Sequence, residues 1–352
     1  MFTSFYYPNA RGGAEEVART LAEGMTNLGH QVTIVTLSDS KLIAENIHGV
    51  SVIRLPLRNF YWPSDDVNHK YLKPFWHILD TYNLFMLSSI KYVLEVIKPD
   101  VVHTHTISGF SPLVWRVARD LNIPVVHTLH DHYILCSRTA MFKNGVACKT
   151  RCLDCSCFSV PKVSATKNVS TVIGVSNYIL EKHLEFSAFL DANKEVIYNP
   201  IDRPVEIKDF SKSSRLTIGF IGSLYAQKGI HVFLSLANRI KQWNFVIAGS
   251  GDNEITSKIE RQVKDSVNLT YLGRSTREDF YNKIDILYVP SLWREAAGRV
   301  IMEAYSYGKP VIGSNVGGIP ESIVVGETGY VVHPRHEEEV ISKIDCIARS
   351  YT

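Results

Sequence analysis

The chain has 352 residues, which favours two domains because single domains usually hold about 100–200 residues. Hydrophobic residues make up 45% and charged residues 21%, an ordinary balance with enough apolar material for two cores. The net charge of +3 is too small to indicate a nucleic-acid-binding protein, which would carry a strongly basic balance.

Neither a leader peptide nor a membrane span is predicted. The N-terminus lacks the basic segment and apolar run of a signal peptide. The longest apolar candidate, residues 79–97, is interrupted by Asp80, Lys91 and Glu95, so it does not provide the ~18 apolar residues that a span needs. We therefore expect a cytoplasmic protein whose six cysteines are thiols or metal ligands rather than disulfides.

Short apolar runs alternate with amphipathic stretches, a pattern typical of βαβ units and parallel sheets. In the first part of the chain we predict strands at residues 2–6, 31–36, 51–55, 101–105, 125–128, 171–174 and 195–198. Helices are predicted at residues 13–28, where Gly29 would end the helix, and at residues 85–97 and 112–121.

The pattern breaks at residues 199–214, where Pro200 and Pro204 precede a polar run that we predict to be a linker. A second series follows, with strands at residues 216–221, 244–248, 268–271, 285–289 and 310–313 and helices starting near Lys228, Asp252, Arg277, Gly298 and Arg335. We therefore predict an α/β protein with two Rossmann-like doubly wound domains, residues 1–200 and 201–352, facing each other across a cleft. Ligands of such sheets bind at the carboxyl ends of the strands.

The most informative segment spans residues 291–321 and reads SLWREAAGRVIMEAYSYGKPVIGSNVGGIPE. It places Glu295 in a loop and Gly298 at the start of a predicted helix that contains Glu303. The N-terminus of a helix suits a diphosphate because it offers unpaired N–H groups and partial positive charge. A carboxylate accepts hydrogen bonds from a pair of sugar hydroxyls. The alternative is an ordinary strand–loop–helix unit with two solvated glutamates.

The whole segment resembles the signature of retaining glycosyltransferases of family four, which have the GT-B fold. Other segments resemble the same family in the same order: the glycine loop in residues 8–17, Gly29-His30-Gln31-Val32, Val175-Ser176, residues 197–202, and residues 219–223 followed by Lys228-Gly229. The resemblance covers nearly the full chain. It implies transfer of a hexosyl unit from a nucleotide diphosphate sugar to a hydroxyl with retention, in cell-surface polysaccharide or glycolipid assembly.

The resemblance also implies a role for each matching residue. Lys228 would neutralise the diphosphate, Glu303 would bind the ribose, and Glu295 would lie by the transferred sugar. His130, which follows a predicted strand, would lie at the donor sugar near the acceptor. The implied catalytic set is His130, Lys228 and Glu295, and the implied donor-binding set is Gly12, Gly13, Ser223, Lys228, Ala297, Gly298, Arg299 and Glu303. The leaving phosphate would accept the proton, so no protein base and no catalytic cofactor is expected.

The chain departs from the family pattern at two places. Ser223 stands where the family usually has an arginine, and Arg299 or Arg294 is the candidate replacement. The chain also stops at Thr352, whereas family members continue into a helix that returns to the N-terminal domain, so we expect a shortened product. These departures leave open a sugar-nucleotide-binding protein with weak or no turnover, and the fold leaves open a sugar-nucleotide epimerase. A nicotinamide-dependent dehydrogenase is rejected because Glu254 replaces the third glycine of its fingerprint.

Five cysteines fall within one predicted loop after His130. Four thiolates could hold a structural Zn²⁺ tetrahedrally and order a loop of this length, and the candidate ligands are Cys136, Cys148, Cys152 and Cys155. Free thiols in a family-specific loop are the alternative.

Residues 54–77 interleave aromatic side chains with Arg58, Lys70 and Lys73. Aromatic rings stack on sugars, and mixed basic and aromatic surfaces favour anionic membranes. This composition predicts a lipid-linked or glycan acceptor that docks here, with peripheral contact at the inner membrane face. The alternative is an irregular lid whose aromatic side chains pack inward.

Overall fold

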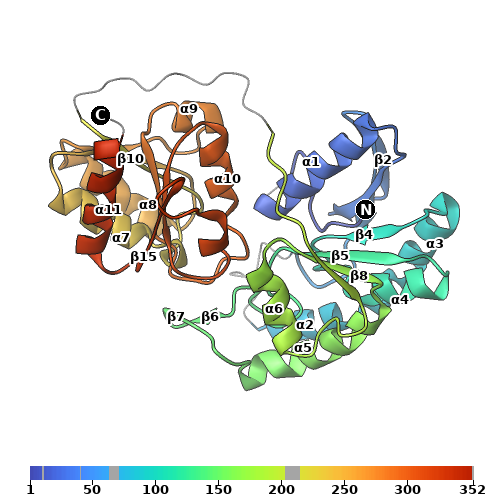
Figure 1. The fold of residues 1–352 in the computed structure, drawn as a ribbon. Coiled ribbons are helices and arrows are strands. Elements are labelled where there is room, and N and C mark those ends of the chain that lie inside the picture. Colours follow the sequence, from blue (N-terminus) through green and yellow to red (C-terminus); the bar gives the residue numbers. More distant parts are fainter. Residues whose placement is uncertain (10–11, 40, 63–70, 203–214, 351–352) are drawn as a thin grey trace. The chain divides into compact units, whose positions relative to one another are not determined.

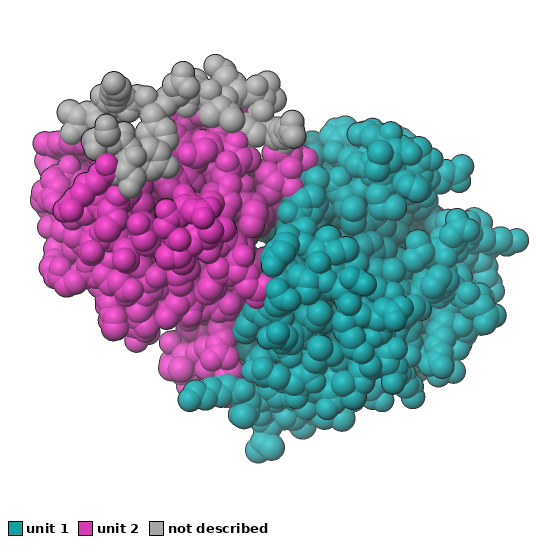
Figure 2. Space-filling model, viewed as in Figure 1, with its two compact units in different colours: residues 1–141, 149–200 teal, residues 142–148, 201–352 magenta. Residues whose placement is uncertain are grey.

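The computed structural model describes residues 1–9, 12–39, 41–62, 71–202 and 215–350. The chain divides into two compact units, which Figures 1 and 2 show. The first unit holds Met1–Met141 and Lys149–Pro200, and the second holds Phe142–Cys148 and Ile201–Thr352. Most of the predicted linker, residues 203–214, lies outside the described residues.

The first unit contains two sets of strands that the N-terminal residues join. One set has the order β1 (Thr33–Ser38), β3 (Val50–Pro56) and β2 (Ile43–Ile47), with β2 antiparallel. The other is the parallel set β4 (Val102–Thr104), β5 (Val125–Leu129), β8 (Thr171–Gly174) and β9 (Asn193–Val196). Phe2 bridges Val35 on one side and Thr104 on the other, so a bridge stands where we predicted a full first strand.

Six α-helices surround these strands in the described part of the first unit, and Figure 1 shows α2 beside α5. They are α1 (Gly13–Asn27), α2 (Lys73–Thr81), α3 (Leu87–Ile97), α4 (Leu113–Asp120), α5 (Leu153–Ala165) and α6 (Asn177–Glu185). Two short 3₁₀ helices are η2 (Leu84–Met86) and η3 (Thr166–Asn168). The sequence did not predict α2, α5, α6 or the edge strand β2.

The second unit has a six-stranded parallel sheet with the order β12-β11-β10-β13-β14-β15. In chain order the strands are β10 (Thr217–Ile221), β11 (Asn244–Ala248), β12 (Leu269–Tyr271), β13 (Ile286–Val289), β14 (Val311–Ser314) and β15 (Gly329–Val332). The strand order reverses between β10 and β13, and ligands of doubly wound sheets bind at such a switch point. A small hairpin, β6 (Phe142–Lys143) with β7 (Val146–Ala147), groups with this unit.

Helices cover both faces of this second sheet, because successive residues of one strand enter different apolar clusters. Ile286 and Tyr288 pack with α7 (Ile230–Arg239), α8 (Asn253–Lys264) and α11 (Glu337–Ser350). Leu287 and Val289 pack with α9 (Arg277–Tyr281) and α10 (Arg299–Ser306). Two 3₁₀ helices, η4 (Ala226–Lys228) and η5 (Pro320–Ser322), complete the unit. The predicted class, α/β with parallel sheets in two Rossmann-like units, is confirmed.

Within the described ranges, no helix combines the length and the apolar character that crossing a membrane requires.

Candidate active site

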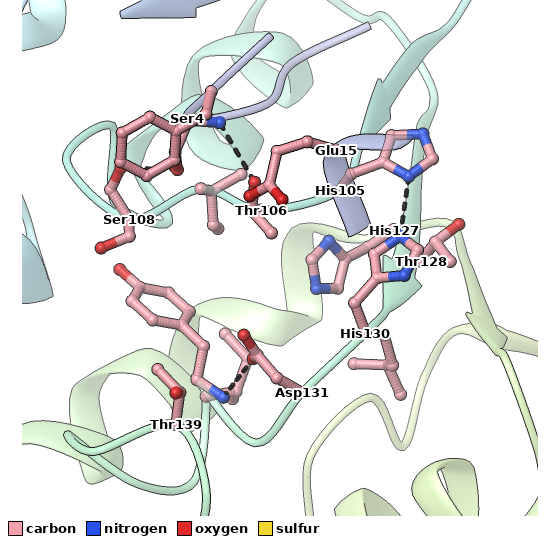
Figure 3. A pocket seen from close by; sticks show the side chains of 15 residues that line it. Ser4, Glu15, His105, Thr106, Ser108, His127, Thr128, His130, Asp131 and Thr139 are labelled. Atoms are coloured by element: carbon pink, nitrogen blue, oxygen red, sulfur yellow. Dashed lines mark hydrogen bonds between the residues drawn. The ribbon is translucent and has the colours of Figure 1, made fainter. Parts of the chain in front are cut away.

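A pocket of about 150 Å³ opens in the first unit beyond the carboxyl ends of β4 and β5. Figure 3 shows the polar side chains that line it, which come from the N-terminal residues, the first turn of α1, strand β5 and the two segments that follow β4 and β5. They include Ser4, Glu15, His105, Ser108, His130 and Asp131. The predicted residue His130 therefore lines a pocket together with other polar side chains and is not an isolated surface histidine.

His130 is paired with a second histidine that the sequence did not single out. The Nδ1 atom of His105 lies 2.9 Å from the Nε2 atom of His130, and the two rings are stacked with centroids 5.2 Å apart. Burial lowers the pKa of His130 to about 3 and holds the pKa of His105 well below its usual 6.5. Both rings are therefore neutral near pH 7, and each carries one N–H group.

The environment of His105 favours one arrangement of these protons. Its Nε2 atom is buried without a hydrogen-bond partner among the described atoms. A buried N–H group without a partner is rarer than an unsatisfied acceptor, which favours a bare Nε2. The proton of His105 then resides on Nδ1 and is donated to Nε2 of His130. His130 in turn carries its own proton on Nδ1, which makes it a hydrogen-bond donor rather than a base.

Acidic side chains also line this pocket. The backbone N–H of Tyr133 donates to Oδ1 of Asp131 at 2.7 Å, and burial raises the pKa of Asp131 to about 6, with the nearby Glu15 adding to the shift. Glu15 lies in the first turn of α1, for which Gly12 is the N-cap and Gly13 the first residue. The glycine loop therefore leads to the same cavity as His130. Residues 10 and 11 of that loop lie outside the described residues.

In the second unit, Lys228 and Glu295 form an ion pair, with Nζ 3.0 Å from Oε1. The loops that carry them are held together closely. The backbone N–H groups of Leu292 and Trp293 donate to the carbonyl oxygen of Gln227 at 2.8 and 3.3 Å. Gly229 has a φ of 76°, and a Cβ atom there would lie 1.8 Å from the carbonyl oxygen of Pro290. Only glycine permits this approach, which positions Lys228 at the switch point of the sheet.

Glu295 is buried and held by its own loop. Ser291 Oγ donates to the Glu295 carboxylate, and the backbone N–H of Gly318 donates to the Glu295 carbonyl oxygen at 2.8 Å. Gly317 has a φ of 61°, and a Cβ atom there would lie 2.3 Å from that same oxygen. The Gly-Gly pair of the signature therefore packs directly against the loop of Glu295, a function that the sequence pattern did not reveal.

Helix α10 starts beside this loop. Gly298 is its N-cap in the left-handed region, with a φ of 63°, and Ala297 is the residue before it. Glu303 is buried within the helix, where Arg299 Nη1 lies 3.5 Å and Arg277 Nε lies 3.2 Å from its Oε1. Tyr281 donates to Oε2 of Glu303 at 3.2 Å. Arg277 and Tyr281 come from α9, so sequence spacing gave no signal for them.

The remaining predicted donor residue, Ser223, is exposed two residues after β10, and its carbonyl oxygen accepts from the backbone N–H of Tyr225 at 2.9 Å. The structure thus brings Lys228 to Glu295 and Arg299 to Glu303. The predicted catalytic set is divided between the units, because His130 belongs to the first and Lys228 and Glu295 to the second.

The predicted four-cysteine zinc site is not supported. Cys136 and Cys155 approach each other, with 3.6 Å between their Sγ atoms. Among the described residues, the group with metal-ligand spacing is Cys152, Asp154 and Cys155, whose ligand atoms lie within 4.8 Å of one another, and neither Cys136 nor Cys148 joins it. The cysteine-rich segment forms regular structure without a four-cysteine site: it contains the hairpin β6–β7 and the start of helix α5, whose N-cap is Cys152.

The aromatic stretch is divided between core and surface. Tyr61 and Trp76 are buried, and Trp76 Nε1 donates to the Tyr61 carbonyl oxygen at 2.9 Å. Phe60, Tyr71 and Phe75 are exposed. Lys70 lies outside the described residues. An entirely inward-packed lid is therefore excluded for the described part of this stretch.

The sequence matches two known protein families. Residues 11–203 match the family described as Glycosyltransferase Family 4, and residues 215–350 match Glycosyl transferases group 1. A protein in the cps region of Klebsiella pneumoniae is 36% identical over 91% of this chain and 86% of its own length. An uncharacterized glycosyltransferase of Methanocaldococcus jannaschii is 26% identical over 98% of this chain and 87% of its own length.

Solved structures show the same architecture. Sucrose-phosphate synthase from Thermosynechococcus elongatus matches with a TM-score of 0.73 and 20% identity, over 98% of this chain and 86% of that one. Anabaena HepE in complex with UDP-glucose matches with a TM-score of 0.71 and 17% identity, over 99% of this chain and 89% of that one. The fold is therefore GT-B, and the chain belongs to glycosyltransferase family 4, whose members are retaining enzymes that use nucleotide-sugar donors.

Proposed function

We propose that this glycosyltransferase moves a hexosyl unit from a nucleoside diphosphate sugar to a hydroxyl of a lipid-linked or glycan acceptor during assembly of a cell-surface polysaccharide. The Klebsiella relative, a protein of the cps region, supports this setting. The first unit would be the acceptor side and the second the donor side. The observation that carries the proposal is the Lys228–Glu295 pair at the switch point of the second sheet, beside the start of α10.

The second unit suits a departing nucleoside diphosphate. Negative charge develops on the diphosphate as the glycosidic bond breaks, and preorganised cations and N–H groups stabilise it without rearrangement. Lys228 would supply the cation, and the backbone N–H groups at Ala297 and Gly298 would supply donors. Arg299, the first residue of α10, would replace the charge that Ser223 lacks. Glu303 would accept hydrogen bonds from the ribose hydroxyls. Gly12 and Gly13 of the first unit stay predicted donor-binding residues.

Neutral His130 suits a role as hydrogen-bond donor to a sugar hydroxyl. A pKa of about 3 makes it a weak base, and its Nε2 already contacts His105. The proton of the attacking hydroxyl would therefore pass to the leaving phosphate oxygen, and no protein base is assigned. The attacking and leaving groups would lie on the same face of the sugar, which gives retention.

The test begins with thermal denaturation of the full chain against a panel of nucleotide sugars, because a bound ligand raises stability by mass action. UDP-glucose is the first choice, since HepE was solved with it. Transfer to acceptor glycans is then followed by NMR of the anomeric proton. Donor-dependent transfer with retention supports the proposal. An inverted product, or stabilisation by no nucleotide sugar, contradicts it. Isomerised donor in the absence of acceptor would instead identify an epimerase.

A further inference from the structure

Helix α2 turns its apolar side outward. Its flanks and body expose large apolar side chains at Tyr71 (94% exposed), Phe75 (57%), Ile78 (60%) and Tyr82 (42%). These positions are separated by four, three and four residues, so they form one stripe along a helix. Leu84 and Phe85 in η2, the next element, are 61% and 69% exposed. We call these six residues the α2 face.

The opposite side of α2 is buried and carries both Trp76 and the polar Asp80. Asp80 is fully buried, and its carboxylate accepts from the backbone N–H of Gly109 at 2.6 Å, from Tyr133 OH at 2.6 Å and from Lys162 Nζ at 3.0 Å. A surface helix of a globular protein normally keeps its large apolar side chains inward and its charged ones in water, so the outward apolar stripe and the buried carboxylate of α2 are both unusual. A buried carboxylate cannot leave its partners without a large cost, so Asp80 keeps the apolar stripe facing outward.

Two basic residues, Arg58 and Lys73, lie beside or within the α2 face. Lys73 lies in α2, whose one acidic residue, Asp80, is buried. Lys91 in α3 pairs with Glu95 at 3.7 Å and adds no net charge. Arg58 is exposed beside the end of α2, because its carbonyl oxygen accepts from Asn83 Nδ2 at 3.0 Å. A helical surface with exposed aromatic side chains and basic neighbours has the composition of segments that lie in the interface of an anionic bilayer.

We propose that the α2 face docks on an anionic lipid bilayer and that the acceptor is consequently a lipid-linked saccharide in that membrane. The inference rests on the proposed function and specifies its acceptor. The partners of Asp80 connect the face to the pocket of the same unit, because Tyr133 lines the pocket and Gly109 follows the pocket residue Ser108. Docking of α2 would therefore hold the wall of the pocket at the membrane surface, where the saccharide of a lipid-linked acceptor lies.

Co-sedimentation of the full chain with vesicles tests the inference. One set of vesicles contains phosphatidylcholine alone, and the other contains phosphatidylcholine and phosphatidylglycerol in equal parts. The double variant Phe75→Ser with Ile78→Ser should reduce partitioning at least about tenfold, because two large apolar side chains no longer enter the interface. The matched control, Leu28→Ser with Val267→Ser, removes side chains that are 80% and 88% exposed elsewhere and should leave partitioning nearly unchanged.

A charge variant provides a second, independent measurement. Arg58→Gln with Lys73→Gln should weaken binding to the anionic vesicles by about tenfold or more and have little effect on phosphatidylcholine alone. Unchanged sedimentation of the Phe75/Ile78 variant would overturn the inference. Self-association of the wild-type chain that this variant abolishes, measured by sedimentation velocity, would also overturn it and assign the face to a second copy.

Donor binding separates failure of this inference from failure of the proposed function. Calorimetry with UDP-glucose on the same variants should give wild-type affinity, because the α2 face lies outside the proposed donor site. Retained donor binding without vesicle binding would refute the membrane inference alone. Absence of binding for every nucleotide sugar in all forms, the wild-type chain included, would count against the proposed function whatever the vesicles show.

Discussion

Nδ1 of the buried His105 lies 2.9 Å from Nε2 of His130, whose ring lines the pocket. If His105 donates in this pair, His105→Asn should preserve function, since an asparagine amide can place an N–H where Nδ1 stood. His105→Leu should lower kcat about tenfold, which corresponds to the loss of one hydrogen bond. Long-range ¹H–¹⁵N spectra should show His130 protonated at Nδ1 in the wild-type chain and in the asparagine variant.

The spectra separate positioning from mere packing. A histidine that only fills space would allow leucine to retain both activity and the tautomer of His130. Protonation of His130 at Nε2 in the wild-type chain would show that our assignment of donor and acceptor is wrong.

Glu303→Gln should weaken donor affinity by about tenfold or more, because a neutral amide is a poorer acceptor for two ribose hydroxyls than a carboxylate. Tyr281→Phe is the matched control, since it removes the 3.2 Å hydrogen bond to Glu303 Oε2 but leaves the carboxylate in place. Calorimetry with the nucleoside diphosphate alone measures the effect. Equal losses in the two variants would indicate that Glu303 acts through the packing of α10 rather than through the ligand.

Lys228→Met should act mainly on turnover. The charge on the diphosphate grows as the sugar leaves, so a cation there stabilises the transition state more than the bound donor, by about 100-fold in kcat or more. The ion pair with Glu295 at 3.0 Å shows that Lys228 already has a partner before donor binds. Pre-steady-state kinetics with saturating donor would measure kcat free of binding. If the Lys228→Met variant had a higher KM and an unchanged kcat, Lys228 would contribute to binding of the donor but not to stabilising the transition state.

The sequence predicted the second unit better than the first for a physical reason. Glu295, Gly298 and Glu303 lie within nine residues, so one loop and one helix place them, and local spacing is enough. Their partners Arg277 and Tyr281 reach Glu303 from α9, and only the tertiary fold reveals this contact. The packing of Gly317 against the backbone of Glu295 is likewise invisible in the one-dimensional pattern.

In the first unit the prediction missed the strands and helices whose apolar residues do not follow the usual strand or helix spacing. Strand β2 reads IAENI and is mostly exposed, so it lacks the alternation that marks a strand. Helix α2 exposes its apolar stripe and buries Asp80, which is why its aromatic residues suggested an irregular segment. Helix α5 contains two of the cysteines that we assigned to a loop, and it also contains Pro161, a residue that disfavours the interior of a helix.

The buried histidines of the first unit should make it sensitive to acid. Burial lowers the pKa of His103 and His183 to about 4 and of His130 to about 3, against 6.5 in the unfolded chain. Below pH 6.5 the unfolded state therefore binds protons that the folded state does not, and stability falls by up to about 1.4 kcal/mol per pH unit for each group. The pKa of Asp131 rises from 3.8 to about 6, so between these pH values the folded state binds a proton that the unfolded state does not. This stabilises the fold as the pH falls, but it is a single group opposing several histidines.

Hydrogen exchange at pH 7 and pH 5, corrected for intrinsic rates, would test this expectation. Peptides that cover β5 should lose protection at the lower pH more than peptides that cover β11 in the second unit. Equal loss in both would show that the histidine cluster does not govern the acid response.

Gly229 and Gly273 offer a matched test of how tightly the Lys228 loop is built. Both have a left-handed φ, 76° and 66°, but a Cβ atom would meet the Pro290 carbonyl oxygen at 1.8 Å only in the first case, and nothing lies within 4 Å in the second. Gly273→Ala should therefore cost about 1 kcal/mol of unfolding free energy, the backbone term alone. Gly229→Ala should cost about 3 kcal/mol or more, because the loop must move away from Pro290, and kcat should fall as Lys228 is displaced.

Urea denaturation and initial rates measure the two effects. Similar costs for the two alanines, with full activity in both, would mean that the close approach at Gly229 relaxes easily and does not position Lys228.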